Sequence, residues 1–238
     1  MKHVRFELWP GIILDARRAV FIESESVLIV ADLHIGYAWA QRSRGHLLPL
    51  SPADDTTERI TELLNEYRPR TLAILGDIVH DTVPIDEFRE MLSSFLQTVG
   101  AQVELRLIEG NHDRWLAREI PYPLLRDWMA GPHRLLHGDA HNAISAVALL
   151  QDAQDAEGRL FLGHEHPAIS ISDGVAHFAR VPCFLASDDW LVLPAFSSWA
   201  AGGDVRRGTF LSPFPQVAPP TKAVAILAGK LLPISLLD

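Results

Sequence analysis

The chain has 238 residues, of which 48% are apolar and 21% charged, and its 21 basic and 30 acidic residues give a formal net charge of −9. That length suits a single globular domain over residues 1–238, and no apolar run reaches the ~18 residues of a membrane span, so a membrane protein is not expected. The acidic balance has the wrong sign for a broad basic face that holds nucleic acid.

In the first part of the chain, short apolar runs alternate with turn residues and with helical patterns. The expected strands cover residues 4–8, 11–14, 19–22, 27–31, 72–75 and 103–108. One helix is expected to begin at Ser51, with Pro52 in its first turn, and to end before Pro69, while Pro84 should begin a second helix. This succession of strands and helices predicts an α/β core.

In the second part, the expected elements are shorter. Strands are expected over 135–136 and 159–162, with a helix over 143–154 between them. Brief β-like runs follow, typical of antiparallel hairpins, over residues 169–171, 176–181, 184–186, 191–193 and 223–227. Residues 212–221 contain four prolines, which predict a surface loop without a regular hydrogen-bond ladder.

The N-terminus and the cysteine content bear on location. Residues 1–5 lead into mixed polar and apolar sequence, without the apolar block and cleavage site of a secretory signal. Cys183 is the only cysteine, so no internal disulfide can form. We therefore expect a cytoplasmic protein.

Five short motifs follow the strand-like runs: Asp32-Leu33-His34, Gly76-Asp77, Gly110-Asn111-His112-Asp113, His137-Gly138-Asp139 and Gly163-His164-Glu165-His166. Open α/β sheets bind ligands at the carboxyl ends of their strands, so these motifs are expected to meet. If extended geometry continues past the strand, the i, i+2 spacing turns both metal-binding side chains of the first and last motifs to one side, and Glu165 faces away. Imidazole, carboxylate and amide ligands suit manganese, iron or zinc, whereas the absence of cysteine from the motifs disfavours a structural zinc site.

The ordered set resembles the signature of the calcineurin-like metallophosphoesterase family, D-x-H, G-D, G-N-H-D/E, H and G-H-x-H, which is complete over residues 32–166. The resemblance implies a four-layer α/β/β/α sandwich of two mixed sheets flanked by helices, with the site at one edge. It implies two divalent transition-metal ions, with Mn²⁺ preferred and iron or zinc as alternatives. The implied ligands are Asp32, His34 and His166 for one ion, Asn111, His137 and His164 for the other, and Asp77 as a bridge.

Three residues beside the ligands are given roles through the same resemblance. His112 looks like the family's catalytic histidine, which protonates the leaving oxygen or stabilises its charge while metal-activated hydroxide attacks phosphorus. Asp113 and Asp139 either accept hydrogen bonds from ligand imidazoles or simply end turns, and the sequence favours neither.

The stretch Gly76-Asp77-Ile78-Val79-His80-Asp81 discriminates within the family. It lacks the G-D-x-x-D-R-G pattern of the Ser/Thr protein phosphatases and is similar to the G-D-x-x-H form of double-strand-break repair nucleases. His80 is therefore a second catalytic candidate, the alternative being an ordinary polar residue near a helix.

Two further stretches look like the bacterial ligase-associated DNA damage response endonuclease family. They are Asp32-Leu33-His34-Ile35-Gly36, followed by Arg42-Ser43-Arg44-Gly45, and Leu193-Pro194-Ala195-Phe196-Ser197. The similarity implies a DNA-repair phosphodiesterase that acts on DNA and associates with a repair ligase or helicase. The alternatives are a hydrolase for a small phosphoester and a non-catalytic scaffold, which the complete ligand set argues against.

Residues outside the signature are weaker candidates for substrate contact. Arg42 and Arg44 either bind substrate phosphate or lie on a solvated loop or helix face. Trp39, Trp115 and Trp128 either stack on a base or pack in the core.

Overall fold

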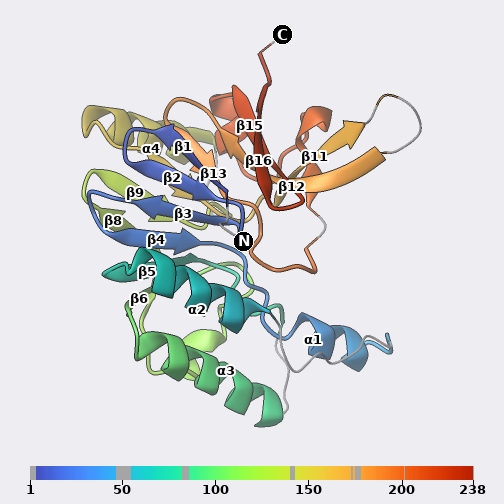
Figure 1. Ribbon diagram of the computed structural model, residues 1–238. Helices are drawn as coiled ribbons and strands as arrows, with labels where there is room; N and C mark the ends of the chain where they lie inside the picture. The colour runs from blue at the N-terminus through green and yellow to red at the C-terminus, as the bar shows by residue number, and fades with distance from the viewer. Residues whose placement is uncertain are drawn as a thin grey trace.

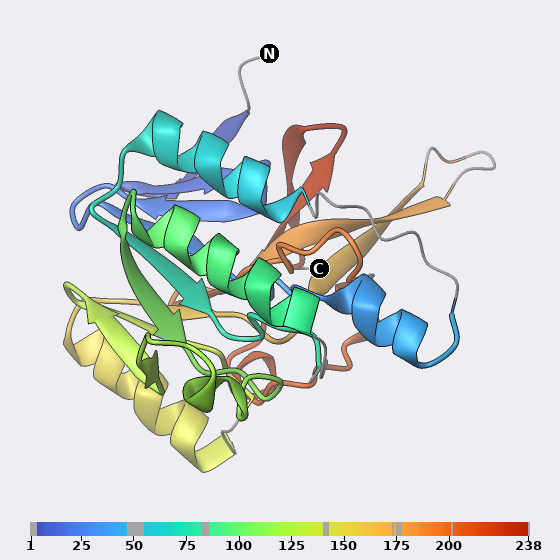
Figure 2. The same ribbon diagram turned by 90° about the horizontal axis from the view of Figure 1, so that it is seen from below.

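Two β-sheets packed face to face form the centre of the fold, and helices cover their outer faces (Figures 1 and 2). The computed structural model describes residues 4–46, 55–81, 86–139, 143–172, 174, 178–200 and 202–237. Helices α2 (Thr56–Tyr67) and α3 (Asp86–Gly100) pack on one sheet, and α4 (Ala143–Asp155) packs on the other. The predicted α/β/β/α sandwich is therefore confirmed.

The first sheet contains seven described strands, in the spatial order β1-β2-β3-β4-β5-β6-β7. Their bounds, in the same order, are Arg5–Trp9, Ile12–Asp15, Ala19–Ile22, Val27–Val30, Thr71–Leu75, Glu104–Ile108 and Leu124–Leu125. Strands β1 to β4 pair antiparallel, whereas β4 to β7 run parallel. Strand β4 is buried on both faces, with Leu28 and Val30 toward the helices and Val27 and Ile29 toward the second sheet, so it reads as an unbroken apolar run.

The second sheet has the order β14-β11-β12-β13-β10-β9-β8, and a β15-β16 hairpin is added beside β12. The bounds of β8 to β16 are Asp127–Ala130, His133–Leu136, Leu160–Leu162, Pro167–Ser172, Phe178–Ala186, Trp190–Val192, Gly203–Asp204, Lys222–Leu227 and Lys230–Ser235. The pairs β9–β10 and β10–β13 are parallel, whereas β11–β12 and β15–β16 are hairpin pairs. Antiparallel pairs are thus present as expected, but the runs over 176–181 and 184–186 are not separate strands: their described residues belong to the single strand β12, and residues 176–177 lie outside the described part. The run over 191–193 also pairs parallel with β10.

Several elements differ from the sequence-based expectation. Helix α1 (Tyr37–Ser43) was not predicted, because Ala40 is its one buried residue and it has no apolar face to show. The predicted proline-rich surface loop is wrong in part: α5 (Phe214–Val217) forms there, with Phe214 and Pro215 buried, and proline is well tolerated in a first helical turn. The expected helix starts at Ser51 and Pro84 lie outside the described residues.

Short 3₁₀ turns complete the fold, over Leu116–Arg118 and Val205–Arg207. Apolar side chains fill three layers, between α2, α3 and the first sheet, between the two sheets, and between the second sheet and α4. Within the described part of the chain, no helix is long and apolar enough to cross a membrane.

A buried ion network ties β2 to α2. The Arg17 guanidinium donates two hydrogen bonds to Asp15, at 2.9 and 2.7 Å, and one to Glu66 at 2.5 Å. The main-chain N–H of Arg17, at 2.8 Å, and the Tyr67 hydroxyl also donate to Asp15. The Asp15 and Arg17 side chains are only 1% and 6% exposed. Burial alone would raise the pKa of Asp15, but the hydrogen bonds and charge of Arg17 outweigh it and the pKa is lowered.

We expect Arg17→Met to lower the free energy of unfolding by about 3 kcal/mol at neutral pH, because Asp15 would remain buried without its cation. The folded-state pKa of Asp15 lies below its unfolded value, so the pair stabilises above about pH 4 and the contribution is lost as the pH falls through the lowered pKa. Thermal unfolding of the metal-free proteins at pH 7 and pH 3.5 checks this. The difference between wild type and variant should narrow at acid pH, and a constant difference would contradict the assignment.

Candidate active site

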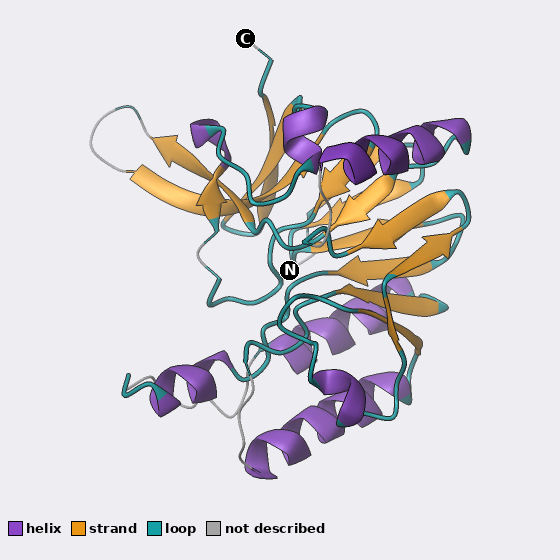
Figure 3. Cartoon of the chain, turned by 180° about the vertical axis from the view of Figure 1, so that it is seen from behind, coloured by secondary structure: helices purple, strands orange, loops and turns teal. Residues whose placement is uncertain are grey.

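The candidate ligands follow the carboxyl ends of parallel strands in both sheets, where loops meet at one edge of the sandwich (Figure 3). The first sheet contributes residues after β4, β5 and β6, namely Asp32, His34, Asp77 and Asn111. The second sheet contributes residues after β9 and β10, namely His137, His164 and His166. Although His34 and His166 are 132 positions apart, their Nε2 atoms lie 3.1 Å from one another.

The carboxylates and imidazoles form two groups that share one residue. In each group, one ligand atom from every residue lies within 4.8 Å of the others. The first group comprises Asp32, His34, Asp77 and His166, and the second comprises Asp77, His137 and His164. Asp77 therefore lies between two possible ion positions, and Asn111 adds an amide oxygen 3.2 Å from His137 Nε2.

The chain reaches this edge through an unusual backbone. Ten described non-glycine residues have positive φ, and five of them are candidate ligands: Asp32, His34, Asp77, His164 and His166. Each such conformation costs about 1–3 kcal/mol and is typical of functional sites. The i, i+2 argument assumed that extended geometry continues past the strands, and this assumption is wrong. The side chains converge instead because left-handed residues alternate with others, such as Leu33, that point into the core.

Two glycines of the motifs allow the loops to approach. A Cβ on Gly110 would lie 2.2 Å from the main-chain nitrogen of Asp77, and a Cβ on Gly76 would lie 2.3 Å from His137 Nδ1. The Gly-Asp and Gly-Asn-His-Asp motifs therefore need glycine because their loops touch at this point.

In the first group, the pKa values of both Asp32 and His34 are lowered, which favours an ionised carboxylate and a neutral imidazole. Burial would raise the pKa of Asp32, but the charge and hydrogen bond of His166, with the charges of His137 and His34, lower it to about 2. Burial lowers the pKa of His34 to about 3, and its Nδ1 is buried without a hydrogen-bond partner among the described residues. At neutral pH the group therefore combines a carboxylate with a neutral imidazole, and both can donate lone pairs to a cation.

The second group presents several acceptors to one point. His137 Nδ1 lies 2.8 Å from the carbonyl oxygen of Leu75, which can only accept, so Nδ1 carries the proton. In the neutral ring, Nε2 then has a free lone pair, and it lies 3.2 Å from Asn111 Oδ1 and 3.5 Å from Asp77 Oδ1. Although burial lowers the pKa of His137, the charges of Asp32 and Asp77 raise it, and when a cation takes the place of the Nε2 proton all three atoms present lone pairs to it. Imidazole, amide and carboxylate ligands match the transition metals expected from the sequence.

His112 lies beside both groups. Its Nδ1 lies 2.5 Å from the carbonyl oxygen of His80, which fixes the proton on Nδ1 and leaves Nε2 facing the site, 3.9 Å from Asp77 Oδ2. Its main-chain N–H donates to Asp77 Oδ1 at 3.0 Å. The ring is 36% exposed, so it can reach a bound substrate.

Comparison with known proteins identifies the family in which this arrangement of residues occurs. The sequence profile of the calcineurin-like phosphoesterases matches residues 26–215, which include all five motifs. The chain belongs to the calcineurin-like phosphoesterase family. It is accordingly a metal-dependent phosphoester hydrolase, and its two ligand groups provide for the divalent ions that the family uses.

Among solved structures, the crystal structure of Pseudomonas putida nuclease MPE matches with a TM-score of 0.65 and 22% sequence identity, over 98% of this chain and 100% of that chain. Its likeness supports the shared fold. A structure of Yfce, a phosphoesterase from E. coli, matches with a TM-score of 0.41 and 13% identity, over 88% and 98% of the respective chains. No curated protein sequence matches this chain.

The acidic residues next to the ligands of this phosphoesterase have different surroundings. Asp113 is fully buried and accepts main-chain N–H bonds from Ile78, Val79 and Gly110, at 3.2, 3.2 and 2.9 Å. It therefore joins two ligand-bearing loops through main-chain amides, and its own N–H donates to the carbonyl oxygen of Gly110 at 3.1 Å, so of the two alternatives the turn fits Asp113 and the imidazole contact does not. Burial raises its pKa to about 7, and the amide donors oppose that shift. Burial lowers the pKa of His137, and the charges of Asp32 and Asp77 and the hydrogen bond to the Leu75 carbonyl raise it. Asp139, at the end of the β9 motif, adds the smallest raising contribution.

Glu165 faces away from the candidate ligands, as expected, although the backbone on either side of it is left-handed and not extended. Its carboxylate accepts main-chain N–H bonds from Leu211, at 3.1 and 2.9 Å, and from Ser212, at 2.8 Å. The loop after β10 is thereby held against residues 211–212.

The basic and aromatic candidates of the sequence fall on different sides of the phosphoesterase. Arg42 and Arg44 lie at the exposed end of α1, and Arg44 forms an ion pair with Asp81 at 2.5 Å. Trp39 and Trp115 pack on the core beneath α2 and α3, and Trp128 packs between the sheets. These three tryptophans are therefore partly buried and pack against the core, as the second of the two interpretations expects.

Sequence reasoning missed a cavity on the His137 side of the site. It has a volume of about 430 Å³ and is lined by Glu109, Gly110, Arg114, Arg126, Asp127, His137, Gly138 and Asp139. Arg114 directly follows Asp113, the last residue of the Gly-Asn-His-Asp motif, and this adjacency was the one feature of the sequence that could have connected it to the site. Arg126 comes from the chain between β7 and β8, which no pattern connected to the site.

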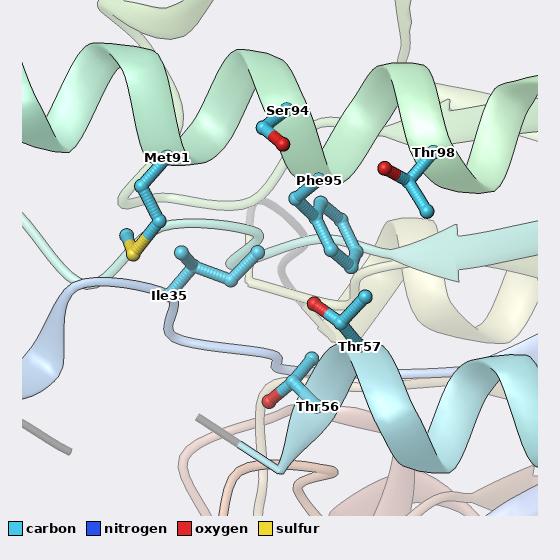
Figure 4. A pocket seen from close by; sticks show the side chains of 7 residues that line it. All are labelled: Ile35, Thr56, Thr57, Met91, Ser94, Phe95 and Thr98. Carbon is cyan, nitrogen blue, oxygen red and sulfur yellow. The ribbon is translucent and has the colours of Figure 1, made fainter. Parts of the chain in front are cut away.

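A second cavity, of about 210 Å³, lies between α2 and α3 (Figure 4). Its lining side chains are Ile35, Thr56, Thr57, Met91, Ser94, Phe95 and Thr98. None of these is titratable, so the cavity contributes no group to the chemistry of the site.

Proposed function

We propose that this phosphoesterase hydrolyses phosphodiester bonds with two divalent transition-metal ions, manganese being preferred, and that it acts on DNA during repair. The observation that carries the proposal is the pair of ligand groups joined at Asp77, with the Nε2 atom of His112 facing them from outside either group. The match over 98% of this chain to a protein described as a nuclease supports a nuclease function. Ligase-associated relatives, suggested by the sequence motifs, make a repair ligase or helicase the proposed partner and the cytoplasm the proposed location.

The proposed ligands divide between the two sheets. One ion would be held by Asp32, His34 and His166, the other by Asn111, His137 and His164, and both by Asp77. When bound, two such ions supply positive charge against the phosphoryl oxygens and make a nucleophile available at neutral pH. The buried carboxylates and neutral imidazoles of the chain orient these ligands in advance, since their strained loops leave them little freedom.

His112 is the proposed proton donor. Because Nδ1 is engaged by the His80 carbonyl, Nε2 of the imidazolium can donate to the leaving oxygen of a phosphodiester held at the ligands. His80 places this acceptor, and its own ring lies 5.6 Å from the His112 ring at an angle of 16°. We therefore propose that His80 orients His112, and that its catalytic part is indirect.

Substrate phosphates flanking the reacting one would find cationic side chains on two sides. Arg114 and Arg126 line the cavity beside His137, and Arg42 and Arg44 lie at the end of α1. Guanidinium groups favour two-point contact with phosphate. Although the net charge of the protein is negative, these four arginines would bind substrate phosphates close to the site, so a broad basic face is not needed.

The test compares three substrates, bis(p-nitrophenyl) phosphate, p-nitrophenyl phosphate and supercoiled plasmid, each with manganese and with chelator. We expect the diester and the plasmid to be cleaved with manganese only. Protein carrying His112→Ala and purified identically serves as the control for contaminating nucleases. Hydrolysis of the monoester alone would refute the nuclease assignment.

A small phosphoester is the second candidate, favoured by the cavity of about 430 Å³, which is within the size range of small-molecule sites. In that case the diester would be hydrolysed and the plasmid would remain intact.

A further inference from the structure

Four aromatic rings form a row that leads from His112 to the surface. The ring centroids of His112 and His80 are 5.6 Å apart, those of His80 and Tyr37 are 4.6 Å apart, and those of Tyr37 and Trp199 are 5.7 Å apart. The Tyr37 and Trp199 rings are stacked, with an interplanar angle of 11°. Trp199 ends the row and is 39% exposed.

The segment that carries Trp199 is fastened to the site. The main-chain N–H groups of Phe196 and Ser197 donate to the carbonyl oxygens of Ala31, at 2.7 Å, and Asp32, at 3.1 Å. The N–H of Trp199 donates to Ser197 Oγ at 3.2 Å. The exposed ring is therefore two residues from a main-chain contact with a candidate metal ligand.

Two arginines donate hydrogen bonds to main-chain carbonyl oxygens of the same segment. Arg18 donates to the carbonyl oxygens of Ala195, at 2.9 Å, and Ser197, at 2.5 Å. Arg59 donates to the carbonyl oxygen of Phe196 at 3.0 Å, and its guanidinium lies 3.9 Å from the centroid of the Phe196 ring. An exposed tryptophan on a segment fixed in this way is ordered before a ligand arrives, so little entropy is lost on binding.

We propose that Trp199, supported by Tyr37, is a stacking platform for the nucleobase of the leaving nucleoside. The inference rests on the proposed phosphodiesterase function. His112 is the group that meets the leaving oxygen, and the row extends outward from it, so the leaving side of the substrate lies along these rings. A base offers a flat π-face whatever its identity, so the platform would bind without choosing a sequence.

The experiment uses two diesters that differ in one feature. One is thymidylyl thymidine, and the other carries an abasic tetrahydrofuran unit in place of the leaving thymidine. With manganese, Trp199→Ala should lower kcat/KM for the first about 5- to 150-fold, the range a stacked base contributes, and leave the second unchanged. Trp199→Phe should retain most of the activity because phenylalanine can also stack.

Met129→Ala is the matched control, since Met129 is 47% exposed and lies on β8 beside Arg134, at the end of that hairpin away from His137. It should change neither substrate. An equal loss on both substrates with Trp199→Ala would overturn the platform and leave the phosphodiesterase function standing, because it would mean that Trp199 only supports its segment.

A binding measurement separates the two proposals further. Thymidylyl thymidine should quench tryptophan fluorescence of the manganese-loaded His112→Ala protein, and adding Trp199→Phe should remove that quenching. If wild-type protein cleaves neither diester, the proposed phosphodiesterase function is wrong. The fluorescence measurement alone then tests whether a base stacks on Trp199. Quenching that depends on Trp199 would support it, and unchanged quenching in the double variant would overturn it.

Discussion

His112→Ala should lower kcat for a phosphodiester by about 10²- to 10⁴-fold while both metal ions remain bound, because positioned acid–base groups contribute on that scale. The main-chain N–H that His112 donates to Asp77 survives this substitution, so the loop keeps its anchor. What is lost is the imidazole whose Nδ1 the His80 carbonyl engages. Metal content from elemental analysis and steady-state kinetics with bis(p-nitrophenyl) phosphate give the two measurements.

The design distinguishes a proton donor from a ligand. A loss of bound metal in His112→Ala equal to that of a ligand variant would contradict the division of roles. His46→Ala serves as a control, because His46 is an exposed histidine just beyond α1 that matches no ligand position of the signature. It should leave metal content unchanged.

Asp77→Ala should have an effect at least as large, with metal content falling below two ions per chain and activity falling to background. Asp77 belongs to both ligand groups, so its removal takes an oxygen from each. Asp77→Asn keeps the shape of the side chain and isolates the contribution of its negative charge. Elemental analysis, kinetics at saturating manganese and thermal unfolding measure the result.

Thermal unfolding provides a second, independent test of the role of the Asp77 carboxylate. Burial and the nearby charge of Asp32 both raise the pKa of Asp77, since two close carboxylates repel when no cation separates them. Without metal, Asp77→Asn should therefore unfold at a temperature no lower than wild type. With manganese the order should invert, because wild type gains binding energy that the variant lacks. A variant that is less stable than wild type under both conditions would indicate a structural role for the carboxylate.

Much of the site was predictable because it lies in short contiguous motifs. Residues such as Asp32 and His166 each follow a recognisable apolar strand, and parallel strands of a sheet bring their carboxyl ends to the same edge. The sequence thus indicated the layers, the family and the set of residues that the loops bring together. It could not indicate how the loops bring them together. Left-handed conformations occur more often at Asp and His than at most residues, but which of them adopt it, as Asp32 and His34 do, depends on the neighbouring loops.

The partners of Asp113 and Trp199 show the limit of local reading. An aspartate at the end of a motif suggested an imidazole partner or a turn; Asp113 does close a turn with Gly110, but its carboxylate also accepts main-chain N–H bonds from the loop after β5, which no local pattern indicates. Trp199 lies outside every motif, and its position depends on Arg18 and Arg59, which are distant in sequence.

The amino-acid sequence by itself determined the chemistry, because metal ligands must be particular residue types at strand ends and those types can be read directly. Only the tertiary structure decided through which loop conformations the candidate ligands meet, which main-chain groups hold His112 and Asp113, and which aromatic rings adjoin His112. Those relations are contacts between segments far apart in the chain, and they depend on how two sheets pack, a property that no local pattern of residues encodes.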